Sequence, residues 1–283
     1  MATNPEPSTG LPDPRAALSD AKDVVQDAAE SDQVGWLARA GLTARGVVYL
    51  LMGVLALLLS QGSSSKHVDQ KGALAEVLSH TFGGVLVGAL AVGFLAYALW
   101  RLAEAAVGVT GEGRMVSARL KSAARGIAYL GLTFTAVSAL RGSAQTQASQ
   151  QTSWTARSMT FTGGRVLVAL VGLLVIAVGA AMVVEGVRLK FMRYFTAVPP
   201  SVHDLIVHLG RIGTVGRGLV FMVIGGLFVS AAWTLDPHQA GGMDVAFRTL
   251  LQQPFGRTLA IAAALALMAF GVYGLAEARY RRV

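Results

Sequence analysis

Six long apolar stretches alternate with short polar segments along this chain. They contain no Asp, Glu, Lys, Arg or His, and they cover residues 47–60, 85–100, 127–140, 166–184, 219–235 and 259–276. With their flanks they reach the roughly 17–25 residues that a helix needs to span a bilayer. A spanning segment must satisfy its own backbone hydrogen bonds, so each stretch predicts a transmembrane helix. The pattern therefore predicts an all-α integral membrane protein with six transmembrane helices.

The six stretches form three tandem pairs that share the same punctuation. An Arg-Gly dipeptide precedes the first stretch of each pair, at Arg45-Gly46, Arg125-Gly126 and Arg217-Gly218. The second stretch begins at a glycine and ends at a glutamate 21 positions later, at 83–104, 164–185 and 256–277. This constant spacing predicts three two-helix repeats at 35–108, 117–190 and 208–282. Repeats that insert with the same orientation are related by rotation about the membrane normal. Three hairpins around a pseudo-threefold axis are the simplest packing, and a two-plus-one arrangement stays open.

The segments outside the repeats are more polar. Residues 1–33 are expected to be a partly disordered cytoplasmic tail. Within it, the capping pair Asp13-Pro14 could begin a short amphipathic helix. A loosely ordered tail is an equally good interpretation. In each hairpin, a partly apolar stretch precedes the second span, which predicts a short helix in the outer membrane interface.

The basic residues indicate how the chain is oriented. Of the 24 lysines and arginines, 17 fall on the side that holds both termini. Cytoplasmic loops carry the excess of Lys and Arg, so both termini are expected inside a multi-pass protein of the inner (plasma) membrane. The net charge of +8 follows from this clustering at the ends of the spans, so nucleic acid is not an expected partner.

The repeated charges lie at the inner ends of the spans. Each first helix brings an arginine and each second helix a glutamate; the six residues are Arg45, Arg125, Arg217, Glu104, Glu185 and Glu277. Charges near a bilayer tend to be paired. We therefore expect structural ion pairs within a unit, such as Arg45 with Glu104, or with the next unit. The alternative is a ring of charges that gates a cytoplasmic mouth.

Glycine spacing and missing chemistry complete the picture. Gly84 and Gly88 have the small-xxx-small spacing of a helix-packing face. The chain has no cysteine, and no span interior holds the ionisable groups of a proton or ion relay. We find no candidate catalytic, metal or cofactor-binding residues, and we expect no cofactor.

Two functional classes agree with these observations. The first is a non-enzymatic structural or accessory membrane protein, alone, self-associated or bound to a larger membrane complex. The alternative is a small channel or carrier for neutral or apolar solutes. A continuous polar strip on inward faces would favour the alternative, and an apolar, filled axis would favour the first.

The stretch Ala38 to Leu50, which reads ARAGLTARGVVYL, resembles the bacterial membrane family called domain of unknown function 1206, which is common in actinobacteria. The abundance of Arg, Ala and Gly also suits a high-GC bacterial genome. The resemblance implies three tandem two-helix units in an inner-membrane protein and brings no activity. Two positions depart from the motif: Lys121 replaces the glycine of the other units, and Phe221 replaces the tyrosine.

Overall fold

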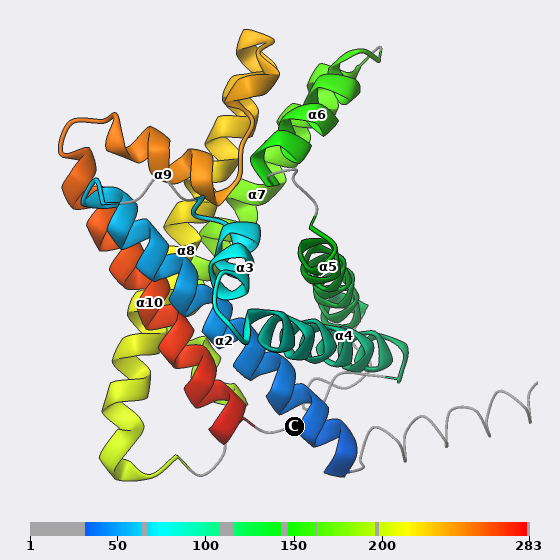
Figure 1. Cartoon of the computed structure of the whole chain (residues 1–283), viewed down its shortest axis with the longest axis vertical. Coiled ribbons are helices and arrows are strands. Elements are labelled where there is room, and N and C mark those ends of the chain that lie inside the picture. Colours follow the sequence, from blue (N-terminus) through cyan, green and yellow to red (C-terminus); the bar gives the residue numbers. More distant parts are fainter. Residues whose placement is uncertain are drawn as a thin grey trace, which may run out of the picture.

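The protein is entirely helical over the residues that the computed structural model describes, which are 32–63, 67–107, 116–142, 147–161, 163–195 and 198–281 (Figure 1). The long helices are α2 (Asp32–Ser60), α4 (Gly83–Val107), α5 (Val116–Leu140), α7 (Gly164–Val187), α8 (Pro200–Thr234) and α10 (Gly256–Tyr280). The short segments between them are α3 (Gln70–Leu78), η1 (Lys190–Tyr194), α6 (Gln147–Met159), η2 (Pro237–Gln239) and α9 (Met243–Leu251). The tail helix expected after Asp13 lies outside the described residues.

Six helices in the described part of the chain are long and apolar enough to cross a membrane, so the predicted fold class is confirmed. Short helices α3, α6 and α9 stand where partly apolar stretches precede the second span of each unit. The apolar side chains of α7 show why the protein sits in a lipid bilayer. Its buried face consists of four glycines, Gly164, Gly172, Gly179 and Gly186, together with Val168. Its leucines and other valines are largely exposed, and such a continuous apolar surface requires lipid.

The repeated glycines begin the second helix of each unit. Gly83, Gly164 and Gly256 are the first residues of α4, α7 and α10. A Cβ atom at these positions would lie 2.0, 1.7 and 2.2 Å from the carbonyl oxygen of the residue six positions earlier. No side chain fits at such a distance, so glycine is needed where the outer helix turns into the second span.

The most extensive helix pairs join different repeats. Each second helix packs along the first helix of another unit, in the pairs α4 with α5, α7 with α8, and α10 with α2. Within units, α8 packs on α10 and α2 on α4, whereas α5 and α7 are not an extensive pair over the described residues. The ring of three hairpins is therefore incomplete, and contacts between units dominate it.

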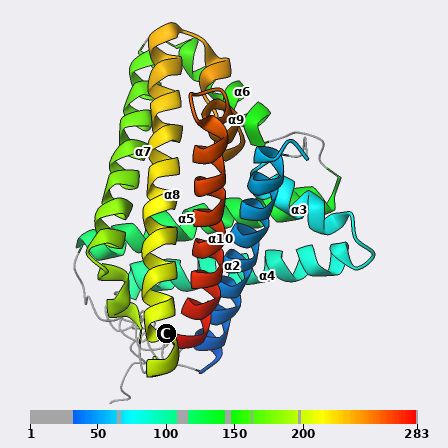
Figure 2. The ribbon, with the colours of Figure 1, turned by 90° about the vertical axis from the view of Figure 1, so that its left-hand side faces the viewer.

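Four of the long helices run side by side and two run across them. Figure 2 shows α2, α7, α8 and α10 upright, with α4 and α5 lying transverse to them. Helices α2 and α8 begin, and α7 and α10 end, at the same end of the molecule (Figure 2). We call this the inner end, in keeping with the expected topology. This arrangement, with α4 and α5 transverse, differs from a bundle of six spans that all run along one axis.

Glycines bring the upright helices close together. At the α7–α8 contact, a Cβ at Gly172 or Gly225 would lie 2.8 or 2.6 Å from the carbonyl oxygen of the other residue. Gly179 and Gly218 form the same kind of pair about two turns further along, with 2.6 and 2.7 Å. Small residues thus allow backbone contact between membrane helices, as expected.

Gly84 and Gly88 do not form the expected packing face against another helix of this chain among the described residues. A Cβ atom at either position would meet nothing within 4 Å. Helix α4 packs instead through its buried face of Val87, Phe94 and Ala98. The i, i+4 spacing places the two glycines on one side of the helix, and this side faces away from every neighbouring helix among the described residues.

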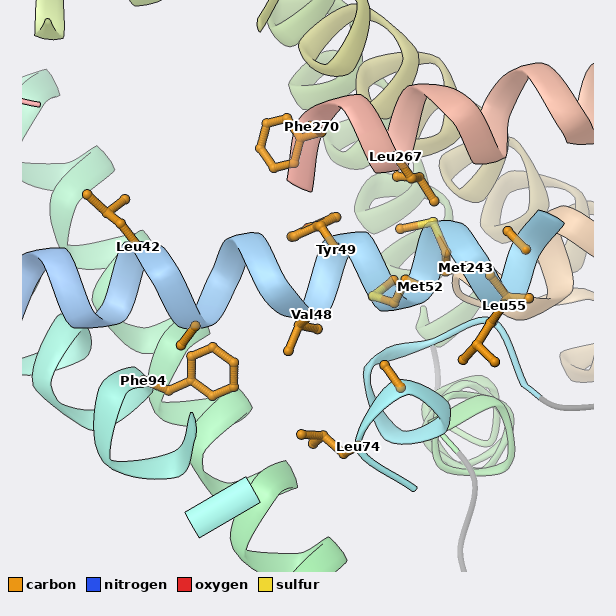
Figure 3. Packing of buried hydrophobic residues seen from close by; sticks show 14 of the residues in the cluster. Leu42, Val48, Tyr49, Met52, Leu55, Leu74, Phe94, Met243, Leu267 and Phe270 are labelled. Carbon is orange, nitrogen blue, oxygen red and sulfur yellow. The ribbon is translucent and has the colours of Figure 1, made fainter. Parts of the chain in front are cut away.

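The apolar core is centred on α2. Figure 3 shows side chains from four other helices packed around it. They are Leu74 of α3, Phe94 of α4, Met243 of α9, and Leu267 and Phe270 of α10. Because α2 contacts both the transverse and the upright helices, it connects the two parts of the molecule.

Candidate functional site

A cavity of about 230 Å³ lies toward the inner end, among all six long helices. Its walls are formed by Arg45, Tyr97, Arg125, Val178, Met182, Glu185, Phe191, Tyr194, Thr214, Arg217, Phe221, Phe270, Tyr273, Glu277 and Arg281. All three repeated arginines and two of the three repeated glutamates are in this set. The structure therefore brings most of the predicted site residues to one place, although they lie far apart in the sequence.

Glu277 is the best-connected charge of the cavity. Arg45 of α2 and Arg281, just after α10, each donate a hydrogen bond to one of its carboxylate oxygens. The exposed side-chain fractions of Arg45 and Glu277 are only 13% and 5%. This clamp joins the first repeat to the third, so the pair forms between units, which was one of the two expected arrangements.

Arg217 has aromatic neighbours in place of a carboxylate. Its guanidinium carbon lies 4.8 Å from the ring centre of Tyr49, 5.1 Å from Phe221 and 4.8 Å from Phe270. Such stacking holds the planar group in place through cation–π attraction. The Nε atom of Arg217 is buried and has no hydrogen-bond partner among the described residues, and the same is true of Nε of Arg45.

Glu104 is not paired with Arg45, which corrects the expected pair within the first unit. Its Oε2 atom accepts hydrogen bonds from Arg101 at 2.6 Å and from Ser122 of α5 at 2.8 Å. Arg101 also donates from Nε to the Tyr97 hydroxyl at 2.9 Å. Helix α4 runs across α2, and its C-terminal end packs against α5. Glu104 therefore bonds to Ser122 of α5 and to Arg101 of its own helix.

The remaining repeated charges are arranged less tightly. Arg125 is exposed, Glu185 and Arg217 are half-buried, and all three line the cavity. Within the described part of the chain, neither Arg125 nor Arg217 forms a salt bridge. Three equivalent Arg–Glu pairs, as a symmetric ring would require, are therefore not formed.

The segment η1 bounds the cavity with Phe191 and Tyr194. The guanidinium carbon of Arg281 lies 4.8 Å from the ring centre of Tyr194. Phe195 forms an isolated antiparallel bridge with Arg281. The linker after the second repeat is thereby attached to the end of the third.

Sequence reasoning missed two arginines that matter. Arg101 stands three residues before Glu104, and Arg281 four residues after Glu277. Both separations place the two side chains on one helical face, where opposite charges can meet. This spacing is a signal that could have been used. Restriction to residues present in all three repeats excluded both arginines.

A second polar cluster ties the outer helices together. Asp244 of α9 accepts hydrogen bonds from the backbone N–H of Val68 at 2.8 Å and from Arg248 at 2.9 Å, and lies 3.0 Å from the His67 ring nitrogen. Burial raises the pKa of the Asp244 carboxyl, but the hydrogen bonds from Arg248, Val68 and His67 outweigh it and hold that pKa below its usual value. Asp69 lies nearby, and burial raises its pKa. Asp244 thus connects α9 to the start of α3.

The described residues hold no group of three or more His, Cys, Asp or Glu side chains that could bind a metal ion. The cavity walls include three tyrosines, Tyr97, Tyr194 and Tyr273, and no serine, cysteine or histidine. Its chemistry is that of charge and hydrogen bonding.

Comparisons with known proteins agree with the repeats. The family model described as Domain of Unknown Function (DUF1206) matches residues 40–108, 120–188 and 212–281. A Bacillus subtilis (strain 168) protein printed as "Uncharacterized protein YxxB" is 28% identical over 250 residues, which cover 87% of this chain and 90% of that protein. No solved structure matches the chain. With three tandem copies of the domain over most of its length, the chain belongs to the DUF1206 family.

Proposed function

We propose that this multi-span membrane protein is a non-enzymatic structural or accessory component, and that its repeated charges hold the three units together. The observation that carries the proposal is the clamp on Glu277. A carboxylate from the third repeat accepts hydrogen bonds from Arg45 of the first repeat and from Arg281. Buried ion pairs of this kind fix the register of the helices that they join.

The alternative, a channel or carrier for neutral or apolar solutes, finds less support. The cavity walls include four arginines, and desolvated charges disfavour an apolar solute. The membrane location and the orientation in this proposal follow from the apolar spans and from the distribution of the basic residues. The protein belongs in the inner membrane with both termini in the cytoplasm, and its accessory role leaves room for a membrane-protein partner or for self-association.

A double-mutant cycle on Arg45→Ala and Glu277→Ala tests the clamp. Each single variant leaves a buried charge without its partner, so each should lose about 3 kcal/mol of unfolding free energy. The double variant should lose clearly less than the sum. The measurement is denaturant unfolding of the full chain in a mild uncharged detergent.

Arg257→Ala is the matched control, because Arg257 is an exposed arginine near the start of α10. Its loss should stay within about 0.5 kcal/mol. Additive effects of Arg45→Ala and Glu277→Ala, or losses no larger than that of the control, would contradict a clamp between units.

A further inference from the structure

The charges of the cavity do not balance. Arg45, Arg125, Arg217 and Arg281 line it, against Glu185 and Glu277 only. The nearby Arg101 is paired with Glu104 and does not change this sum. Two positive charges are thus left over where the cavity adjoins the apolar parts of the spans. Unbalanced charge in such a place is costly unless it is neutralised.

The free hydrogen-bond donors point in the same direction. The Nε–H groups of Arg45 and Arg217 are buried and have no partner among the described residues. A buried donor without an acceptor costs about 1–3 kcal/mol, so an acceptor that reaches either group would stabilise the protein. Arginine has no acceptor atoms of its own, and the ligand must therefore supply the lone pairs.

The shape of the donors selects the kind of anion. The guanidinium of Arg217 is held by the rings of Tyr49, Phe221 and Phe270, which fixes its plane and orients its N–H edge. A planar fork of N–H donors matches the paired oxygens of phosphate. The volume of about 230 Å³ lies below the roughly 300–1,000 Å³ of pockets for drug-sized ligands. A single phosphate group fits this size.

We propose that the cavity among the three repeats binds a phosphate group, which Arg217, Arg45 and Arg125 hold through charge and hydrogen bonds. The cavity lies at the inner ends of the apolar runs, the depth expected for lipid headgroups. A phosphate can therefore reach it from the cytoplasm as free inorganic phosphate or from the bilayer as the headgroup of an anionic phospholipid. This binding goes beyond the structural role proposed above and does not depend on it.

The experiment uses the full chain, delipidated in a mild uncharged detergent. In the first arm, thermal unfolding is followed while potassium phosphate replaces potassium chloride at constant ionic strength, which cancels general screening. In the second arm, native mass spectrometry counts bound phosphatidylglycerol against phosphatidylcholine. A saturable stabilisation in the first arm identifies free phosphate. Preference for phosphatidylglycerol without a phosphate effect identifies the lipid headgroup.

Variants locate the site. Arg217→Gln should weaken binding by about tenfold or more, because a hydrogen bond to a charged group is lost. Arg217→Lys should not rescue it, since lysine lacks the planar fork. Arg257→Gln, outside the cavity, should bind as the natural chain does. If Arg217→Gln fails to fold, Arg125→Gln serves in its place, because Arg125 is exposed and makes no salt bridge among the described residues.

Three results would overturn the proposal. The first is the absence of saturable binding in both arms. The second is equal binding of phosphatidylglycerol and phosphatidylcholine without any phosphate effect. Both lipids carry a phosphate, but the choline cation cancels its charge, so a site with two surplus arginines must prefer the anionic headgroup. The third is equal weakening by the cavity variants and by Arg257→Gln, which would indicate a nonspecific response to surface charge.

Discussion

At the scale of single residues, the bonding partners of a charged side chain depend on which helix packs beside it. Glu277 and Glu104 occupy the same place in their repeats. Glu277 accepts from Arg45 of another unit, whereas Glu104 accepts from Arg101 on its own helix and from Ser122. A glutamate at the same position of the repeat therefore makes different bonds in the two units.

The outer cluster gives a prediction on pH. Asp244→Asn removes a carboxylate that accepts from Arg248, His67 and the Val68 N–H. At pH 7 we expect a loss of about 1.5–3 kcal/mol of unfolding free energy, the contribution of hydrogen bonds to a charged group. Because the folded-state pKa of Asp244 is lowered, its stabilisation is complete above the unfolded pKa of about 3.9 and disappears as pH falls through the folded value.

The measurement is denaturant unfolding of the natural chain and the Asp244→Asn variant from pH 7 down to pH 3. The difference between the two should shrink only below about pH 4. Asp69, whose pKa is raised by burial, has the opposite sign, since its contribution is present at low pH and is lost as pH rises through its folded pKa. The Asp244 charge contributes to this raised pKa, so the opposing contribution of Asp69 should be smaller in the Asp244→Asn variant. A difference independent of pH would contradict the role of the Asp244 charge.

At the scale of elements, helix contacts depend on which face of each helix carries small residues. Helix α7 is apolar almost all round, and its buried positions are mainly glycines. It packs on α8 along Gly172–Gly225 and Gly179–Gly218, where a Cβ would meet a carbonyl oxygen of the other helix. The glycines thus determine which face of α7 packs on α8, because its apolar residues are spread over all faces.

Two adjacent glycines of α8 test this directly. Gly225→Ala places a Cβ 2.6 Å from the Gly172 carbonyl oxygen, so the helices must separate and about 1–3 kcal/mol should be lost. Gly226→Ala meets nothing within 4 Å. It should be neutral or stabilising by up to about 1 kcal/mol, because alanine is the better helix former. Unfolding in mild detergent gives both values, and equal effects would show that the α7–α8 contact is not as close as described.

At the scale of the whole molecule, the transverse pair α4 and α5 raises the question of topology (Figure 2). Both helices are long and apolar enough to cross a membrane, and the basic residues favour both termini inside. Because α4 and α5 lie transverse, the decisive point is which side of the membrane the chain reaches between these two helices.

Reporter fusions settle this point. A reporter after Val283 should read cytoplasmic and one within residues 142–153 should read external, because six spans alternate in direction. A fusion after Gln61, at the outer end of α2, is the control and should also read external. A reporter within residues 108–115, between α4 and α5, should read cytoplasmic. An external reading there, together with external readings after Gln61 and within 142–153, would mean that the α4–α5 pair does not cross the membrane.

The sequence by itself determined the six long helices and the residue at which the second helix of each unit begins. Spans and repeats are local properties, written in runs without charge and in the constant distance from Gly83, Gly164 and Gly256 to the repeated glutamates. The structure begins α4, α7 and α10 at these very glycines. The gathering of the repeated arginines near one another also followed from their shared end of the spans, although the cavity that they line did not.

Only the tertiary structure decided the partners. Membrane helices are apolar on most sides, so their sequences carry little information on which face meets which neighbour. Spacing suggested Gly84 and Gly88 as a contact, yet they face open space, while Gly225 is buried against α7. The same reason explains why Arg45 meets Glu277 and not Glu104. A pair depends on the rotation and crossing of whole helices, and these are set by packing over the entire molecule.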